Sequence, residues 1–158
     1  MSTSSNTACS SHPCLASLFL RLALGIMIFP HGAQKLLGWF GGYGYSGTIQ
    51  FFTGTLHIPY VFALAAILIE FFGGIALILG LFTRVAAVLV GLELAIAAYL
   101  VHLPNGFFMN WGGQQKGEGI ELFILVLGIA IALALLGGGG ISLDKAFCKE
   151  KAPEPTAT

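Results

Sequence analysis

Four long stretches of apolar residues, separated by shorter polar segments, make up most of the chain. They cover residues 15–35, 60–81, 84–101 and 120–141. Each approaches the roughly 20 residues that a helix needs to cross the apolar core of a bilayer. Apolar and polar residues do not alternate in them, as they would in the strands of a membrane β-barrel. The pattern therefore predicts an all-α integral membrane protein, a four-helix transmembrane bundle.

The polar interruption between the first two stretches, a loop over residues 38–58, is predicted to hold a short helix. Ser46 can cap the start of such a helix. Ile49, Phe52 and Leu56 would then share one apolar face, which suits a helix that lies in the membrane interface. In that position the segment could cover the polar groups at the adjoining helix ends.

Composition favours the lipid bilayer as the partner of this chain. Hydrophobic residues make up 56% of it and charged residues only 9%, against roughly 25% charged residues in soluble domains. Seven basic residues balance seven acidic ones, so no basic patch for nucleic acid is expected. The low charge together with the high apolar content also excludes a disordered chain.

The two ends of the chain are predicted to be tails outside the membrane. Residues 1–13 are rich in Ser and Thr and are interpreted as a disordered N-terminal tail, followed by a membrane domain over residues 14–144. Residues 145–158, with two prolines and mixed charge, form a C-terminal cytoplasmic tail. Counting Lys and Arg near the helix ends favours both termini in the cytoplasm, with only Lys35 and Lys116 outside. The basic residues on the inner side are then Arg21, Arg84, Lys145, Lys149 and Lys151.

Three charged residues, Arg21, Glu70 and Glu93, lie inside the predicted helices. A charge in hydrocarbon is costly unless it is paired or neutralised, so these side chains are expected to face the bundle interior. We expect Arg21 to pair with Glu70. Because one positive charge cannot neutralise two carboxylates, one glutamate is expected to be protonated. Such a carboxyl group either handles protons beside a redox or transport site or serves only the structure.

A second group of polar residues lies where the helices are predicted to end on the outer side. It comprises His31, Lys35, His102, Asn105 and Glu121. His31 and Lys35 are four residues apart and therefore share a helix face. Pro30 lacks a backbone N–H, which predicts a kink or an unwound turn just before His31. We expect these helix ends to converge into a candidate polar site.

Metal and haem chemistry finds little support in the pattern. The three cysteines of the chain match no zinc or haem-attachment spacing. His31 and His102 provide one histidine per helix, and nothing else in the sequence supports haem ligation. No metal site is expected, and no cofactor is evident from the motifs alone.

Several short motifs follow one another in a characteristic order along the chain. They are RLALG from Arg21, PHGAQKL from Pro30, FGGYG from Phe40, EFFGG from Glu70, GLFTR from Gly80, HLPNGFF from His102, GIE from Gly119 and SLD from Ser142. In this order they resemble the DoxX family of small bacterial membrane proteins. Each motif is weak alone, but the combination is specific and spans roughly residues 21–144. The positions that match the family pattern are Arg21, His31, Lys35, Glu70, Arg84, Asn105 and Glu121.

The resemblance implies a bacterial inner-membrane protein linked to quinone-related redox chemistry, because the family is named after a subunit of a thiosulfate:quinone oxidoreductase. It implies a quinone-interacting or redox-accessory subunit of a membrane oxidoreductase, at most one part of an enzyme. His31 and Lys35 would then donate hydrogen bonds to a quinone, and Glu121 would handle protons. The electrons would come from a partner redox subunit, since the sequence carries no flavin, haem or iron–sulfur signature.

Two functions from other classes stay open. The chain could be a non-catalytic membrane scaffold or assembly factor, in which the interior charges only fix the helix register. It could also be a small-molecule permease, which is disfavoured because a single four-helix unit lacks inverted repeats and would have to form a homo-oligomer.

Overall fold

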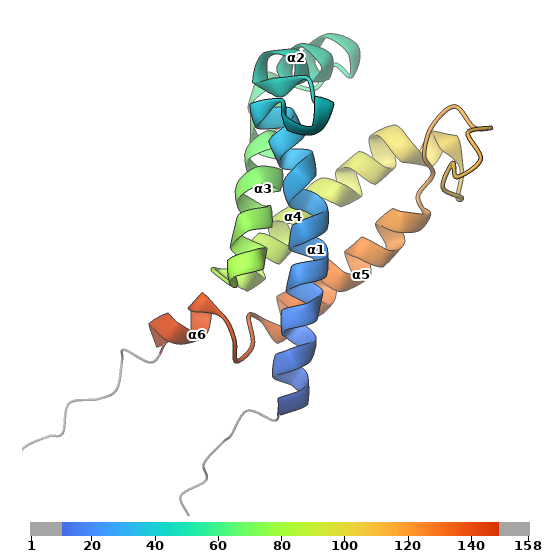
Figure 1. Ribbon diagram of the computed structural model, residues 1–158. Helices are drawn as coiled ribbons and strands as arrows, with labels where there is room; N and C mark the ends of the chain where they lie inside the picture. The colour runs from blue at the N-terminus through green and yellow to red at the C-terminus, as the bar shows by residue number, and fades with distance from the viewer. Residues whose placement is uncertain (1–10, 149–158) are drawn as a thin grey trace, which may run out of the picture.

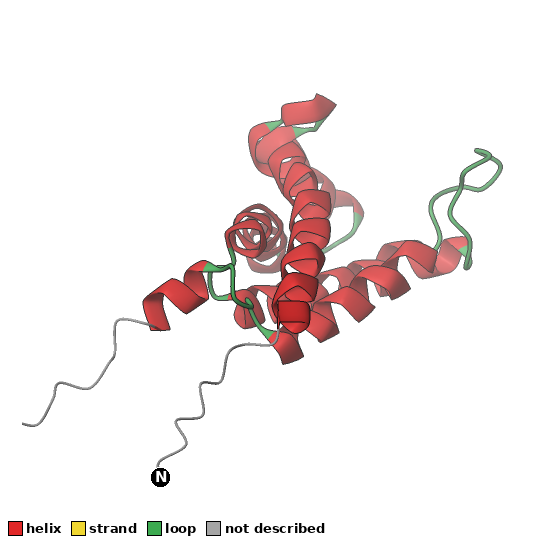
Figure 2. Ribbon diagram, turned by 60° about the horizontal axis from the view of Figure 1, so that its bottom comes forward, coloured by secondary structure: helices red, strands yellow, loops and turns green. Residues whose placement is uncertain are grey.

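The computed structural model describes residues 11–148, and this part of the chain is helical without any β-strand (Figures 1 and 2). Four helices correspond to the four apolar stretches: α1 (Ser11–Leu37), α3 (Tyr60–Leu79), α4 (Thr83–Ala97) and α5 (Glu121–Leu136). A π-helical turn, η3 (Ala98–His102), and a 3-10 turn, η4 (Leu103–Asn105), extend α4. The predicted all-α membrane fold is confirmed.

Three of these helical segments are long and apolar enough to cross a bilayer: Cys14–Leu37, Tyr60–Leu79 and Thr83–Asn105. The fourth helix, α5, is apolar but has 16 residues, or about 24 Å. It ends at Leu136 and not at Ile141, where the sequence placed its end. The reason is local, because Gly137 and Gly139 have φ of 77° and 73°, left-handed values that do not continue a right-handed helix.

The ends of the described chain are more helical than expected. The first helix, α1, begins at Ser11, ahead of the predicted start of the membrane domain at residue 14, and runs without interruption through Pro30. The unwound turn expected before His31 is therefore absent from this helix. After the glycine-rich segment, a short helix α6 covers Leu143–Cys148. The parts of the predicted tails at residues 1–10 and 149–158 lie outside the described residues.

The short helix expected between the first two apolar stretches is present. It consists of a 3-10 turn, η1 (Trp39–Gly41), the helix α2 (Gly44–Gln50) and a π-helical turn, η2 (Phe51–Thr55). The predicted cap at Ser46 is wrong, because α2 begins two residues earlier, at Gly44. A hydrogen bond of 2.6 Å between the hydroxyl groups of Tyr45 and Tyr60 connects α2 to the start of α3.

Close packing of α1 against α3 depends on glycines. A Cβ atom added at Gly32 would lie 2.4 Å from the backbone nitrogen of Phe71, and one added at Gly74 would lie 2.9 Å from the Cα atom of Phe29. Such small residues let two membrane helices approach closely, where dispersion and not water exclusion holds them together. The glycines therefore set the distance and register between α1 and α3.

The helices form two pairs, α1 with α3 and α4 with α5, which diverge from one another in Figure 1. At the end where α1 begins, here called the Arg21 end, the pairs are joined by polar contacts. Ser17 donates a hydrogen bond to the carbonyl oxygen of Gly137. Arg21 of α1 donates to the carbonyl oxygen of Ile141, after α5. Asp144 of α6 accepts hydrogen bonds of 2.6 and 2.9 Å from the backbone N–H groups of Phe82 and Thr83, which attaches α6 to the start of α4. At the opposite end, here called the Lys35 end, the pairs lie apart.

Candidate functional site

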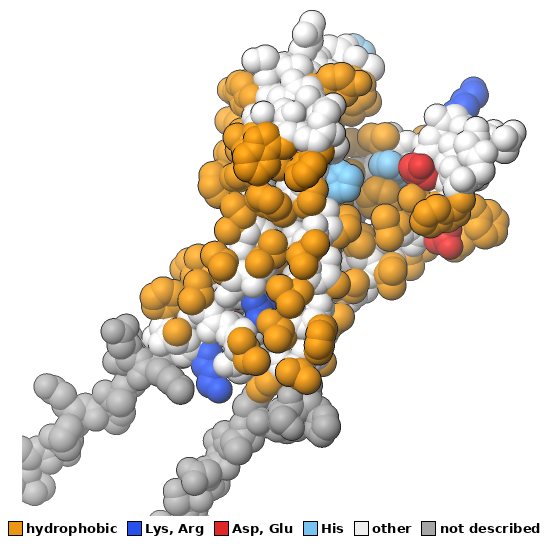
Figure 3. All heavy atoms as spheres, in the orientation of Figure 1, with side chains coloured by type: hydrophobic (Ala, Val, Ile, Leu, Met, Phe, Trp, Pro, Cys, Tyr) orange, Lys and Arg blue, Asp and Glu red, His pale blue; other side chains and the backbone are white. Residues whose placement is uncertain are grey.

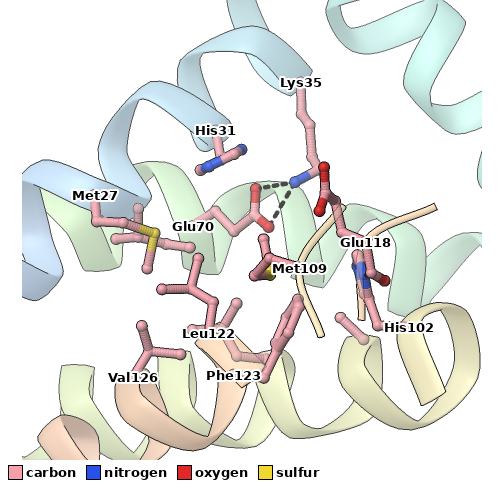
Figure 4. Close-up of a pocket in the computed structure, with 13 residues that line it drawn as sticks. Met27, His31, Lys35, Glu70, His102, Met109, Glu118, Leu122, Phe123 and Val126 are labelled. Carbon is pink, nitrogen blue, oxygen red and sulfur yellow. Dashed lines mark hydrogen bonds and ion pairs between the residues drawn. The ribbon is translucent and has the colours of Figure 1, made fainter. Parts of the chain in front are cut away.

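A cavity of about 230 Å³ lies between the two helix pairs toward the Lys35 end (Figure 4). Figure 3 shows histidine and acidic side chains gathered in this hollow, with hydrophobic side chains around them. The four long helices and the loop before α5 all contribute to its wall. The lining residues are Met27, Ile28, His31, Lys35, Glu70, Leu94, Ala97, His102, Met109, Glu118, Leu122, Phe123 and Val126.

An ion pair between α1 and α3 forms the most polar part of the cavity wall. The ammonium group of Lys35 lies 2.6 Å from Oε1 of Glu70 and also bonds to Oε2. The Glu70 side chain is 4% exposed and that of Lys35 26% exposed. An ammonium group has three N–H donors. Two of them therefore serve Glu70, and the third is left for a ligand.

The expected pairing of Arg21 with Glu70 is wrong. Arg21 is buried at the Arg21 end, where it donates to the carbonyl oxygens of Leu77, Ile78 and Ile141. Helical side chains lean toward the N-terminus of their own helix. Lys35 therefore leans down α1 toward Glu70, whereas Arg21 leans away from it toward the last turn of α3. Arg21 holds the segment after α5 in place and does not reach the cavity.

His31 lies one turn before Lys35, on the same side of α1, and faces the cavity. Its charged neighbours are Lys35 and Glu70. The ring is exposed and makes no hydrogen bond to any residue in the described part of the chain. Both ring nitrogens are therefore available to a ligand.

On the opposite side of the cavity, His102 is held in one orientation by the loop and by α5. Its Nδ1 lies 2.9 Å from the carbonyl oxygen of Glu118. Its ring packs on that of Phe123 with the centroids 4.3 Å apart. A carbonyl oxygen only accepts, so Nδ1 carries the proton and, in the neutral ring, Nε2 is a hydrogen-bond acceptor.

The other two predicted site residues lie next to the cavity but not in its wall. Asn105 donates hydrogen bonds of 3.2 Å to the carbonyl oxygens of Val101 and Glu118. Glu121 accepts a hydrogen bond of 3.1 Å from the backbone N–H of Met109. Both side chains therefore brace the loop that leads into α5. The structure brings His31, Lys35 and His102 together and places Asn105 and Glu121 behind that loop.

Glu118 lines the cavity, although sequence reasoning did not single it out. Its carboxylate accepts a hydrogen bond of 2.6 Å from the backbone N–H of Asn110, which closes the loop on itself. The available signal was an acidic residue between two glycines, Gly117 and Gly119, in a polar loop. Loops of this kind often carry functional groups.

Glu93 lies behind the ion pair on α4. Its carboxyl group interacts electrostatically with Glu70 and Lys35, and its Oε2 is buried without a hydrogen-bond partner among the described residues. The interior charges near the cavity thus form one group of Lys35, Glu70 and Glu93. Arg21, which the sequence placed with these glutamates, is not part of it.

The size and chemistry of the cavity limit what it can hold. Its volume is below the roughly 300–1,000 Å³ typical of pockets for drug-sized ligands, so a single ring system is a better fit than a dinucleotide. Among residues 11–148, no group of three or more His, Cys, Asp or Glu side chains is placed to hold a metal ion. With Glu70 bonded to Lys35 and Glu118 bonded to the loop backbone, the two imidazoles and the ammonium group suit an uncharged ligand with oxygen atoms.

Comparison with known proteins agrees with the order of the motifs. The chain matches the DoxX family model over residues 16–103. It is 35% identical over 137 residues to a protein of Bacillus subtilis (strain 168) named "Putative oxidoreductase CatD", and the match covers 87% of this chain and 90% of that protein. No solved structure matches the chain. The family match over more than half of the sequence, on a helical fold with membrane-spanning segments, shows that this chain belongs to the DoxX family.

Proposed function

We propose that the cavity binds the head group of a quinone and that the protein is a quinone-interacting, redox-accessory subunit of a membrane oxidoreductase system. The observation that carries the proposal is the presence of His31, with no hydrogen bond to the described residues, beside the Lys35–Glu70 pair in an otherwise largely apolar cavity. The name of the Bacillus subtilis relative supports the oxidoreductase class.

The polar groups suit a ring with oxygen atoms at opposite positions. On one side, His31 and the third N–H of Lys35 can donate to one oxygen. On the other side, Nε2 of His102 can accept a hydrogen bond from the hydroxyl group of the reduced ring. A bound quinone would supply the electron-accepting chemistry. Since the sequence carries no flavin, haem or iron–sulfur signature, we propose that a partner redox subunit supplies the electrons.

Replacing His31 with alanine is expected to weaken the binding of menadione, a quinone without a tail, by about tenfold, which corresponds to the loss of one good hydrogen bond. Titration of the purified protein in detergent, followed by quenching of tryptophan fluorescence, measures this change. His57→Asn is the matched control, because it removes an imidazole outside the cavity and Asn tolerates the φ of 55° at that position.

Three results would overturn the quinone site. If wild-type protein binds no menadione, the proposal fails and a scaffold or assembly role becomes the better account. If His31→Ala binds menadione as tightly as wild type does, the quinone ring is held by other residues. Equal weakening by His57→Asn would show an indirect effect on the fold and would also contradict the site.

We propose that the protein lies in the bacterial inner membrane with both termini in the cytoplasm. The structure places Arg21, Arg84 and Lys145 at one end of the bundle and Lys35 and Lys116 at the other. In the sequence, Lys149 and Lys151 follow directly after α6, and an excess of basic residues of this kind marks a cytoplasmic side.

A reporter fused after Thr158 is therefore expected to be active only when it is one that works in the cytoplasm. Single cysteines introduced at Tyr43 and Gln114 should react with a membrane-impermeant reagent added from outside, because both positions lie in exposed loops at the Lys35 end. Activity of a periplasmic reporter at residue 158 would reverse the topology.

A further inference from the structure

The cavity has an opening between α1 and α5. These helices contact each other at the Arg21 end, where Ser17 bonds to Gly137, and separate toward the Lys35 end (Figure 1). Met27 on α1 and Leu122 on α5 line the cavity and are also partly exposed, Leu122 to 39%. They therefore form the rim of the opening, here called the α1–α5 mouth.

The α1–α5 mouth lies at the depth of the hydrocarbon. Glu70, in the cavity wall, is the eleventh of the 20 residues of α3, so it lies about 15 Å from either end of that helix. Met27 precedes the end of α1 at Leu37 by ten residues, which also corresponds to about 15 Å. Since the apolar core of a bilayer is about 30 Å thick, both residues lie near its middle. The α1 side of the mouth therefore lies at the depth of the lipid chains, and Leu122, the second residue of α5, forms its other side.

The loop before α5 covers the cavity from the Lys35 end. Met109 and Glu118 of this loop are part of the cavity wall. The loop is held by hydrogen bonds of 3.1 Å from the N–H of Ile120 to the oxygen of Gly106 and of 2.9 Å from the N–H of Glu121 to the oxygen of Phe107. A braced polar segment therefore lines the cavity toward the Lys35 end, whereas the α1–α5 mouth is lined by the apolar side chains of Met27 and Leu122.

We propose that the ligand reaches the cavity sideways from the bilayer through the α1–α5 mouth, and that the site selects a ring that carries a long apolar tail. The ring lies between His31 and His102, and the tail passes between Met27 and Leu122 into the lipid. A ring without a tail has no part that extends between the apolar side chains of the mouth. A tailed molecule dissolved in the bilayer already lies at the depth of the mouth. This inference rests on the proposed quinone site and adds the class of quinone and its route.

The test compares menadione with a naphthoquinone that has the same ring and a long isoprenoid tail. Leu122→Trp narrows the α1–α5 mouth and is expected to weaken binding of the tailed quinone by about tenfold, which corresponds to about 1.4 kcal/mol and to a moderate overpacking cost. Because Leu122 also lines the cavity, menadione binding is expected to fall as well, but by clearly less than the binding of the tailed quinone. The protein is reconstituted in lipid nanodiscs, so that partition of each quinone into lipid is the same for every variant.

Leu125→Trp is the matched control, because Leu125 lies one turn further along α5, is 62% exposed and does not line the cavity. It is expected to leave the binding of both quinones unchanged. Met27→Trp narrows the α1–α5 mouth from α1 and should reproduce the selective effect, which keeps the test decisive if Leu122→Trp does not fold.

The possible results distinguish the lateral entry route from the head-group site itself. Selective weakening of the tailed quinone by both mouth variants supports the route. If both quinones bind these variants as they bind wild type, or if both are weakened equally, the lateral route is wrong while the head-group site stands. If wild type binds neither quinone, the proposed function fails together with the route.

Discussion

Replacing Lys35 with methionine is expected to remove a large part of the stability of the folded protein. Both carboxylate oxygens of Glu70 bond to Lys35, and the Glu70 side chain is 4% exposed in the middle of α3. The substitution keeps an apolar stem at residue 35 but leaves a carboxylate in the membrane interior without its counter-ion. Removing one partner of a buried ion pair costs roughly 3–5 kcal/mol. Thermal unfolding in detergent and the yield of monodisperse protein measure the loss.

The companion substitution, Glu70→Gln, is expected to cost less. Lys35 is 26% exposed, and its flexible stem can carry the ammonium group toward the membrane boundary when its partner is removed. In the double variant neither charge is left unpaired, so a large share of the stability should return. Additive losses from the two changes would contradict the pairing.

Arg21→Gln combined with Glu70→Gln is the control for this cycle. Within the described chain, Arg21 donates its hydrogen bonds to backbone carbonyl groups at the far end of the bundle. The effects of the two changes should therefore add to within about 0.5 kcal/mol, as they do for distant sites without shared partners. Strong coupling between the two changes would instead support the pairing of Arg21 with Glu70 that the sequence pattern suggested.

Replacing Gly32 with alanine is expected to disrupt the contact between α1 and α3. The added Cβ atom would lie 2.4 Å from the backbone nitrogen of Phe71, and a backbone atom cannot move aside as a flexible side chain can. Overpacking costs about 1–3 kcal/mol in well-packed interiors, and the upper part of this range is expected here. Because the shift would also separate Lys35 from Glu70, the variant should lose ligand binding as well as stability.

Gly128→Ala is the matched control for Gly32→Ala. Gly128 lies in the middle of α5, and a Cβ atom there would meet nothing within 4 Å. This change is expected to be neutral or to stabilise the helix by up to about 1 kcal/mol, because Ala is a better helix former than Gly. Thermal unfolding of the two variants under the same conditions measures the difference. Equal stability of the two would show that the close approach at Gly32 is not required.

The helices could be predicted because their cause is local. Each long apolar stretch must satisfy its own backbone hydrogen bonds in lipid, and a helix does so within the segment. The end of α5, which the sequence placed too late, also has a local cause in the positive φ values of Gly137 and Gly139. Some features of the candidate site could also be predicted from the sequence, because the i, i+4 spacing of His31 and Lys35 places both on one side of α1.

The sequence by itself determined that this is a helical membrane protein of the DoxX family with charged residues inside its apolar segments. Only the tertiary structure decided which charge meets which: Glu70 pairs with Lys35, and Arg21 bonds to carbonyl groups at the other end. The glycine contacts between α1 and α3 set the register of these helices, and a shift of one turn would bring different side chains together. The position of Glu118 in the cavity likewise depends on how a loop folds back onto distant helices. Contacts between segments far apart in the chain depend on packing in three dimensions, and the spacing of residues within one helix carries no information about them.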